Sequence, residues 1–446
     1  MDGATNETEV KRENGSLSDS ASFPEGGIRA WATVLGAFLI QFCGFGYTTN
    51  FYVRDYLSHS SSSAISWIGS VNALLIISVG LFIGRLYDRG HFRLLLYGGC
   101  FLQAFSLFML SLAQRQQLYQ MFLTQGVGLG LGAGLVYIPS VAIVSHYFHQ
   151  KRALAMSIVA SGSSFGAIVH PIMLNHTLHS TLGFGSAVRA SAGVVSGSLL
   201  CTCLLMRPRL PPTQSNPHFW RSVWQFCHDV PYVLATLGLA FFSITFYWPL
   251  FFLQLDTITH GIHPTFAFYS LVIFNASSFV SRICPGFFAH SLGIANMATA
   301  SEGGGAVLVL GMIGISNVAS VVVLCIFGGF FSGMFITMMA PLVSLLTRDL
   351  SELGLRMGLF FAMEGIGDLI GKQHIAPTHH RTSDKRRLVW WRACLFSGLS
   401  GLVSFGFFVA MILSVRRAEK KAPPEPEKGI DDVDRKGEVK TSSTPC

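Results

Sequence analysis

The sequence predicts an all-α integral membrane protein with twelve transmembrane helices, arranged as two six-helix halves. Half of its 446 residues are hydrophobic and only 12% are charged, about half the charged fraction of an ordinary soluble domain. The mean hydropathy is +0.49. Hydrophobic residues gather in long runs, and a long polar break follows the sixth run. These observations exclude a disordered chain, a disulfide scaffold and an ordinary cytosolic enzyme.

Each apolar run is interpreted as a helix, because lipid offers no partner to the unpaired backbone groups of an open strand. A helix needs ~20 mostly apolar residues to cross the hydrocarbon core. The eleventh run, with roughly 17 residues, is at the short end of this requirement. The runs cover residues 30–53, 64–84, 94–113, 118–144, 153–174, 184–206, 230–253, 265–288, 294–316, 318–346, 355–371 and 393–415.

The polar segments divide the chain into five parts. Residues 1–29 and 416–446 are expected to be disordered cytoplasmic tails, because they are polar, charged and poor in large hydrophobic residues. Residues 30–206 form the N-terminal six-helix half and residues 230–415 the C-terminal half. Residues 207–229 are expected to be a cytoplasmic loop that joins the two halves.

The distribution of Lys and Arg predicts the orientation of the chain in the membrane. With a cytoplasmic N-terminus, 21 of the 31 cations fall on the inner side, nine on the outer side, and Arg282 lies within a run. Positively charged loops stay in the cytoplasm. We therefore expect a multi-pass protein of the cell membrane with both termini cytoplasmic.

Six of the nine outer cations lie in one segment, residues 372–392, directly after the short eleventh run. Two interpretations of this segment stay open. In one, residues 372–390 replace an apolar stretch, and an ancestral helix continued past Gly371. In the other, the segment is a genuine basic loop. It should lie outside the hydrocarbon core, because burying Lys372 in lipid would be costly.

The two halves show a faint internal repeat. Gly84 at the end of the second run and Gly286 at the end of the eighth are 202 residues apart, from their numbers. Arg152 at the start of the fifth run and Arg356 at the start of the eleventh are 204 apart. Two independent offsets that agree this closely predict duplicated halves, as in many secondary transporters.

The second run ends in the sequence Gly84-Arg85-Leu86-Tyr87-Asp88-Arg89-Gly90. Gly84 permits close helix approach, and Asp88 is suited to cap a helix N-terminus or pair with a cation. Taken alone, the stretch could be a basic loop next to the membrane, and Arg89 would then add to the positive charge of this loop. Its position after the second run resembles the loop signature of the major facilitator superfamily, with Gly84, Asp88 and Arg89 as gating residues. The second half has His290 where the signature would have an Asp.

Two further stretches resemble the signatures of the monocarboxylate transporter family within that superfamily, in the form found in fungal members. Residues 25–31 read EGGIRAW, and residues 146–155 read HYFHQKRALA. The resemblance implies the major facilitator fold and a secondary active transporter that moves a small organic acid by alternating access. Lys151 and Arg152 hold this end of the fifth helix at the cytoplasmic surface, and we group them with the gating residues.

Arg282 is a cation deep in a predicted span, which makes it a candidate functional residue. Asn275, Ser278 and Arg282 follow one another at i, i+3 and i+7, on one stripe of the eighth helix. A guanidinium there is suited to bind a substrate carboxylate through two parallel hydrogen bonds. The alternative is a cation that extends to the nearby membrane surface. The family resemblance implies the binding role, because its members carry an Arg in this helix for the anionic substrate.

Polar and aromatic residues near helix breaks are further candidates for contacts with the substrate. Each of the aromatic rings is alternatively explained by packing or by the interfacial aromatic belt. The candidate residues are Tyr47 and Asn50 in the first helix, Asn275 in the eighth, Tyr137 beside Pro139 and Tyr247 beside Pro249.

The chain departs from proton-coupled relatives at two places. The resemblance implies an acid one turn before Arg282, where this chain has Ser278, and a Lys late in the first helix, where it has residues 48–50, TTN. Intramembrane acids occur elsewhere, at Glu302, Glu364 and Asp368. Glu364 and Asp368 are candidates for a proton relay, and the alternative is a structural pair between Asp368 and Lys372.

The sequence lacks a phosphate loop, metal-ligand spacing and a nucleophile elbow. We therefore expect a transporter and not an enzyme, with no cofactor, no metal and no nucleic-acid partner. Its expected partners are the lipid bilayer and a small organic anion, either monocarboxylate-like or an acidic secondary metabolite, with proton coupling as a further hypothesis. The alternative function is a non-transporting membrane sensor or partner protein derived from a transporter.

Overall fold

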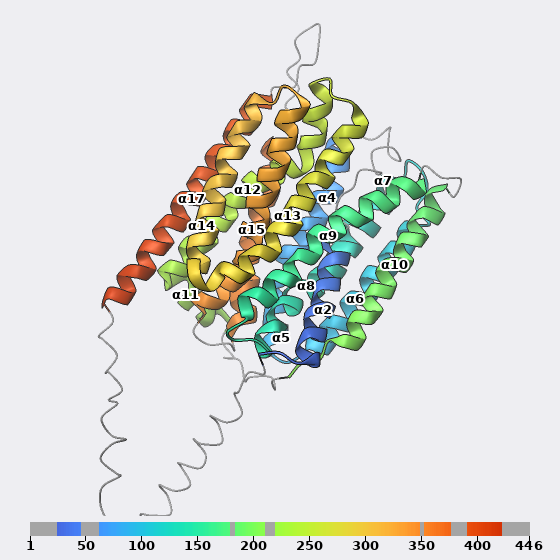
Figure 1. Ribbon diagram of the computed structural model, residues 1–446. Helices are drawn as coiled ribbons and strands as arrows, with labels where there is room; N and C mark the ends of the chain where they lie inside the picture. The colour runs from blue at the N-terminus through green and yellow to red at the C-terminus, as the bar shows by residue number, and fades with distance from the viewer. Residues whose placement is uncertain are drawn as a thin grey trace, which may run out of the picture.

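Figure 1 shows the computed structural model of the protein, which describes residues 25–45, 62–178, 183–209, 219–347, 352–375 and 390–421. Every regular element in these ranges is helical. The N-terminal half consists of α2 (Ile28–Cys43), α4 (Ser62–Ser78), α5 (Gly80–Asp88), α6 (Phe92–Leu110), α7 (Leu118–Met121), α8 (Leu129–Ala142), α9 (Arg152–Leu178) and α10 (Gly183–Leu205). The C-terminal half consists of α11 (Phe219–His228), α12 (Val230–Thr259), α13 (Pro264–Leu292), α14 (Ile294–Gly311), α15 (Val318–Leu346), α16 (Leu353–Ile375) and α17 (Trp390–Lys421).

Several of these helices join end to end into single spans. α4 and α5 form one span, and a π-helix over Phe122–Gly128 joins α7 to α8. In the described residues, nine helices are long and apolar enough to cross a bilayer, or ten if the bent pair α11 and α12 is one span. The two further helices are α2, whose described part is short, and α16, which carries Arg356, Glu364 and Asp368. The twelve-helix prediction is consistent with this arrangement.

The helices pack as two bundles that meet along a long central interface. In Figure 1 the blue to green helices of the N-terminal half lie at the right and the yellow to red helices of the C-terminal half at the left. α9 packs against α13 and α15, and α16 packs against α4 and α5. We call the lower end in this view, which carries the start of α2, the end of α5 and the end of α17, the tail end.

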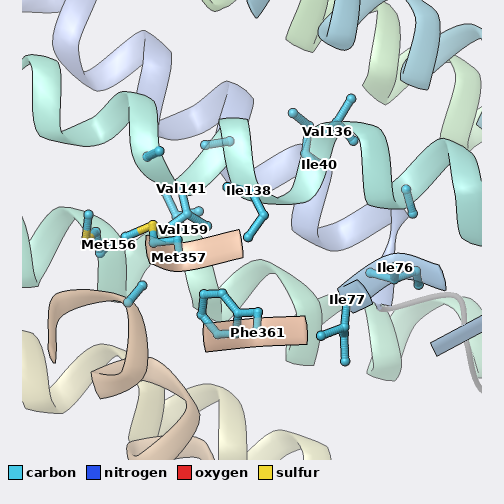
Figure 2. Packing of buried hydrophobic residues seen from close by; sticks show 14 of the residues in the cluster. Ile40, Ile76, Ile77, Val136, Ile138, Val141, Met156, Val159, Met357 and Phe361 are labelled. Carbon is cyan, nitrogen blue, oxygen red and sulfur yellow. The ribbon is translucent and has the colours of Figure 1, made fainter. Parts of the chain in front are cut away.

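The buried core continues across this interface. Figure 2 shows Ile138 and Val141 of α8 and Met156 of α9 close to Met357 and Phe361 of α16. All five belong to one apolar cluster, together with residues of α2, α12 and α15. Burial of apolar surface therefore holds the two halves together in this conformation. By contrast, many large apolar side chains on the outside are exposed, as expected for a surface that faces lipid.

The glycines that indicated the repeat occupy equivalent places in the two halves. A Cβ atom on Gly84 of α5 would collide with the backbone carbonyl of Gly354 in α16. A Cβ atom on Gly286 of α13 would lie 2.8 Å from the Cα of Leu154 in α9. Each glycine thus allows a helix of one half to touch a helix of the other half closely at the tail end.

The structure differs from the predicted boundaries at several helix ends. α17 continues through Lys421, so the first residues of the segment expected to be a disordered tail are helical. Their basic side chains suit the negative end of a helix dipole. α16 extends to Ile375, beyond the predicted end at Gly371. Residues 376–389 lie outside the described residues, and the two interpretations of the basic segment stay predictions.

The predicted central loop contains the amphipathic helix α11, which meets α12 at an angle of 91°. Trp220 and Trp224 are 79% and 69% exposed, one turn apart, whereas Ser222 and Phe226 are buried. α11 therefore lies across the tail end with an aromatic face turned outward, an arrangement typical of helices at a membrane–water interface.

The two segments that resemble family signatures meet at the tail end. Oε1 of Glu25 accepts hydrogen bonds from the backbone N–H groups of His149 and Gln150, both at 2.7 Å, and Oε2 accepts one from Lys151 at 3.1 Å. The carboxylate thus caps the N-terminus of α9, where the helix dipole favours a negative charge. Burial raises the pKa of Glu25, but the three N–H groups outweigh it and hold the pKa below its ordinary value.

We expect Glu25→Ala to lower the stability of the protein by about 1 kcal/mol at neutral pH, the usual loss for an N-cap. The folded-state pKa is depressed, so this stabilisation is present above the ordinary carboxyl pKa of about 4.3 and is lost as the pH falls through the folded value. Thermal unfolding followed by tryptophan fluorescence in detergent would measure the difference. An equal difference at neutral and strongly acidic pH would contradict a role for the carboxylate charge.

Candidate central binding site

A cavity of about 100 Å³ lies between the two halves. Its walls come from α2, α4, α8 and α9 of the N-terminal half and from α12, α13, α15 and α16 of the C-terminal half. Most of the lining is apolar or aromatic, including Phe242, Phe246 and Phe361. The polar residues of the lining are Gln41, Tyr137, Ser163, Ser164, Asn275, Arg282, Thr337 and Glu364.

Arg282 extends from α13 to the facing helix α9 and is only 7% exposed. Its Nη1 donates to the backbone oxygen of Ala160 at 2.9 Å and to Oγ of Ser163 at 2.6 Å. Its Nε donates to Oγ of Ser278 at 3.2 Å, one turn earlier on the same helix. The guanidinium thus lies between the halves, at the wall of the cavity, and does not extend to the surface.

Ser278 occupies the place where the family resemblance implies an acid. Its hydroxyl accepts from Arg282 and lies 3.0 Å from Oγ of Ser164 in α9. The three hydrogen bonds that Arg282 donates to Ala160, Ser163 and Ser278 thus all end on neutral oxygen atoms.

Two acids of α16 lie near this cation but differ in their surroundings. Glu364 lines the cavity and interacts electrostatically with Arg282. Asp368, one turn further along, is fully buried and does not belong to the cavity lining. The side chain of Lys372 lies outside the described residues, and its predicted pairing with Asp368 stays a prediction.

Of the other residues predicted to contact the substrate, Asn275 and Tyr137 line the cavity. Asn275 lines the cavity, and its Nδ2 donates to the backbone oxygen of Leu271 at 2.9 Å, which orients the amide oxygen. Tyr137 lines the cavity and packs edge-on against Phe361, with ring centroids 5.6 Å apart. Tyr247 lies on α12, but its side chain is outside the described residues. Tyr47 and Asn50 are also outside them.

Sequence reasoning missed several residues of the site. Ser163 and Ser164 lie in a stretch of small residues in α9 that suits helix packing, and only their contacts with Arg282 and Ser278 distinguish them. Phe242 and Phe246 look like any aromatic residue of an apolar helix. No local pattern separates an aromatic ring that lines a cavity from one that faces lipid.

Two of the predicted gating residues, Asp88 and Arg152, form a second group of contacts, at the tail end. Oδ1 of Asp88 accepts from the backbone N–H of Gly354 at 3.1 Å, and Oδ2 accepts from that of Leu355 at 2.8 Å. Asp88 of the N-terminal half therefore caps α16 of the C-terminal half, which is the capping role that the sequence suggested. Nη1 of Arg152 adds a bond to Oγ of Ser344 in α15, at 2.6 Å.

Among the described residues, the side chains of Arg89 and Lys151 form no hydrogen bond or ion pair between the two halves. Both side chains are exposed. The backbone N–H of Lys151 donates to Glu25, within the same half. Their grouping with the gating residues stays a prediction.

Arg356 links the capped end of α16 to α11. Its Nη1 lies 2.8 Å from Oδ2 of Asp229, and its guanidinium lies over the ring of Phe226 at 4.4 Å. The hydroxyl of Tyr232 donates to the backbone oxygen of Arg356 at 2.7 Å. The turn of α16 that Asp88 caps is therefore fixed within its own half as well.

Comparison with known proteins agrees with this architecture. A family model described as Major Facilitator Superfamily matches residues 33–372. The chain belongs to the major facilitator superfamily. It is a membrane transporter and not an enzyme. The hypothesis of a non-transporting sensor finds no support, because the relatives below are named as a transporter and an efflux protein.

Two fungal relatives and one solved structure illustrate the similarity. The chain is 32% identical to the MFS-type transporter dbaD of Emericella nidulans over 397 residues, covering 86% of each chain. It is 35% identical to the aspyridones efflux protein apdF of the same organism over 360 residues, covering 79% of this transporter and 72% of that protein. The MFS transporter FucP in its outward conformation shares the fold, with a TM-score of 0.68, 15% identity, and coverage of 85% and 98%.

Proposed function

We propose that this transporter moves a small organic acid, either monocarboxylate-like or an acidic secondary metabolite, across a membrane by alternating access. The observation that carries the proposal is the position of Arg282, a buried cation at the wall of a largely aromatic cavity between the halves. A substrate carboxylate would bind the guanidinium. An apolar or aromatic body would lie along Phe242, Phe246 and Phe361.

Two further observations support this class of cargo. The contact of Glu25 with the segment at residues 149–151 joins the two stretches that resemble the signatures of monocarboxylate porters. A fungal relative at 35% identity is named as an efflux protein for aspyridones. We therefore favour export of an acidic secondary metabolite as the physiological direction.

We also propose that the protein lies in the cell membrane with the tail end in the cytoplasm. The excess of Lys and Arg on this side supports the orientation. In this orientation, Asp88 and Arg152 join the halves at the cytoplasmic ends of the helices. The conformation is then the one closed toward the cytoplasm, with Gly84 and Gly354 in contact.

Glu364 offers a route to proton coupling at the same site. An ionised Glu364 competes with a substrate carboxylate for Arg282, because both anions share one cation in one cavity. Protonation of Glu364 removes this competition and favours anion binding. Asp368, one turn away on α16 and electrostatically coupled to Glu364, is a candidate to receive the proton.

Binding tests with matched acids and amides would examine the proposal. A ligand that binds the folded state raises the melting temperature. We expect naphthoate and lactate to stabilise the purified protein, and naphthamide and lactamide to leave it unchanged. An acid that stabilises should then exchange across proteoliposomes containing the protein. Equal stabilisation by the amides would contradict recognition of a carboxylate.

Asp88→Asn is expected to slow the transport cycle more than it weakens substrate binding, because Asp88 lies at the helix junction and outside the cavity. The amide keeps one acceptor oxygen but loses the charge that favours the N-terminus of α16. We expect the closed state to lose about 1 kcal/mol, equivalent to roughly a fivefold shift in population. Rates and apparent affinities in proteoliposomes would separate the effects, and an unchanged rate with a shifted affinity would contradict this role.

A further inference from the structure

A second, smaller cavity lies inside the C-terminal half. It measures about 30 Å³, enough for about two water molecules. Its walls come from α12, α13, α14 and α15 and are mainly apolar. Phe242 and Phe246 line both this cavity and the central one, and their rings stack with centroids 5.4 Å apart. Two aromatic rings therefore separate the small cavity from the substrate site.

The small cavity contains an acid, Glu302 of α14, which is 2% exposed. Its Oε1 has no hydrogen-bond partner among the described residues. The carboxyl group interacts with the hydroxyl of Ser404 in α17. Ser404 already donates its hydrogen to the backbone oxygen of Gly238, at 2.8 Å. While Ser404 keeps this bond, a hydrogen bond between Ser404 and Glu302 uses the hydrogen of a neutral Glu302. An ionised Glu302 would instead require Ser404 to turn its single hydrogen away from Gly238.

The other polar groups of the cavity wall are hydroxyls that also donate elsewhere. Ser301 donates to Ala298 at 2.9 Å, Thr245 to Ser397 at 2.8 Å and Ser332 to Gly329, all to backbone oxygens. Each hydroxyl turns acceptor lone pairs toward its remaining neighbours. The polar part of the cavity is thus a set of acceptors around one acid, which suits a proton carried with water.

The helices around Glu302 supply no balancing charge in the described residues. α15 contains no Asp, Glu, His, Lys or Arg. In α12, Asp256 lies 3.2 Å from Nδ1 of His260, close to the end of the helix. Arg282 of α13 lines the central cavity and not this one. In α17, the charged residues are confined to the first turn and the last two turns. An ionised Glu302 would be an uncompensated buried charge, which costs several kcal/mol.

We propose that Glu302 is a proton-binding site of this transporter, separate from the substrate cavity and reached from it past Phe242 and Phe246. Release breaks the O–H bond of the acid, passes the proton to a water molecule in the cavity and leaves the carboxylate. The carboxylate is tolerated only when more water enters, which requires the two rings to move apart. Proton release at Glu302 is therefore tied to movement of α12, the helix that carries both rings.

Infrared difference spectroscopy of the purified protein in nanodiscs tests this site without any substrate, so its outcome is independent of the proposed cargo. At neutral pH we expect a carboxylic-acid carbonyl band that shifts in D₂O, and that converts to a carboxylate band at alkaline pH. Glu302→Gln should remove this band. Asp256→Asn, a matched change at another buried acid of the same half, should retain it.

Phe246→Ala should open the partition and speed the shift of the band in D₂O several-fold, which keeps the test informative if Glu302→Gln folds poorly. An unchanged band in Glu302→Gln would overturn the proposal, because Glu302 would then not carry the proton. A Glu302 band that neither shifts in D₂O nor titrates would also overturn it, because the acid would then be sealed and purely structural.

Discussion

Arg282→Ala is expected to abolish transport of an anionic substrate while the amount of protein in the membrane stays near normal. The variant loses the cation that the described residues contribute to the cavity lining. A charge-assisted hydrogen bond contributes about 1.5–3 kcal/mol, so binding of a carboxylate should weaken by roughly 10- to 100-fold. Exchange of a radiolabelled carboxylate in proteoliposomes, together with melting-temperature shifts, would measure the loss.

Arg282→Lys should also fail, although it keeps the charge. The guanidinium bonds Ala160 and Ser163 through Nη1 and Ser278 through Nε, and the fixed directions of these donors hold it between the halves. An ammonium is a point charge and cannot reproduce this geometry.

Two controls separate charge from structure. Ser163→Ala removes one link between the halves but keeps the cation, and should retain most of the transport. Arg189→Ala removes an exposed Arg of α10 whose bonds stay within its own helix, and should behave like the wild type. Full transport by the Arg282→Ala variant would contradict the assignment of Arg282 as the main contact for the substrate charge.

Gly84→Ala is expected to prevent full closure of the tail end. The added Cβ would collide with the backbone oxygen of Gly354, and a backbone atom cannot rotate away as a side chain does. Forcing a methyl group into a packed interface costs about 1–3 kcal/mol. The contact exists only when the halves are closed at the tail end, so the cost destabilises this conformation alone. The population should therefore shift roughly 5- to 150-fold toward the conformation that is open at the tail end.

Spin labels on two exposed tail-end residues, Arg93 of α6 and Arg221 of α11, would measure the shift in a cysteine-free background. We expect a longer distance distribution for Gly84→Ala than for the parent. Gly193→Ala is the matched control, because a Cβ atom on this α10 glycine meets nothing within 4 Å. Identical distributions for Gly84→Ala and the parent would show that the close contact does not set the conformational balance.

Local chemistry made much of the fold predictable from the sequence. Long apolar runs predicted the spans because the bilayer selects uninterrupted apolar helices. The run at 318–346 has the bounds of α15 itself. Where the predicted and observed helices differ, the cause is physical. α17 extends past its predicted end because the basic segment that follows the apolar run still forms helix. α11 was not predicted because it is too polar to appear as an apolar run. The family-level prediction was confirmed, whereas the monocarboxylate-porter subfamily stays a proposal.

The partners of the functional residues were decided by the tertiary structure. The sequence by itself singled out Asp88, Arg282 and the acids of the spans, because charge and special residues stand out in apolar helices. It could not say that Asp88 caps α16, 266 residues away along the chain, or that Arg282 bonds Ser163 in the other half. Nor could it say that Glu302 borders a cavity of its own. These pairings depend on how the two bundles dock, because the direction of a side chain across an interface is fixed by packing between helices distant in sequence.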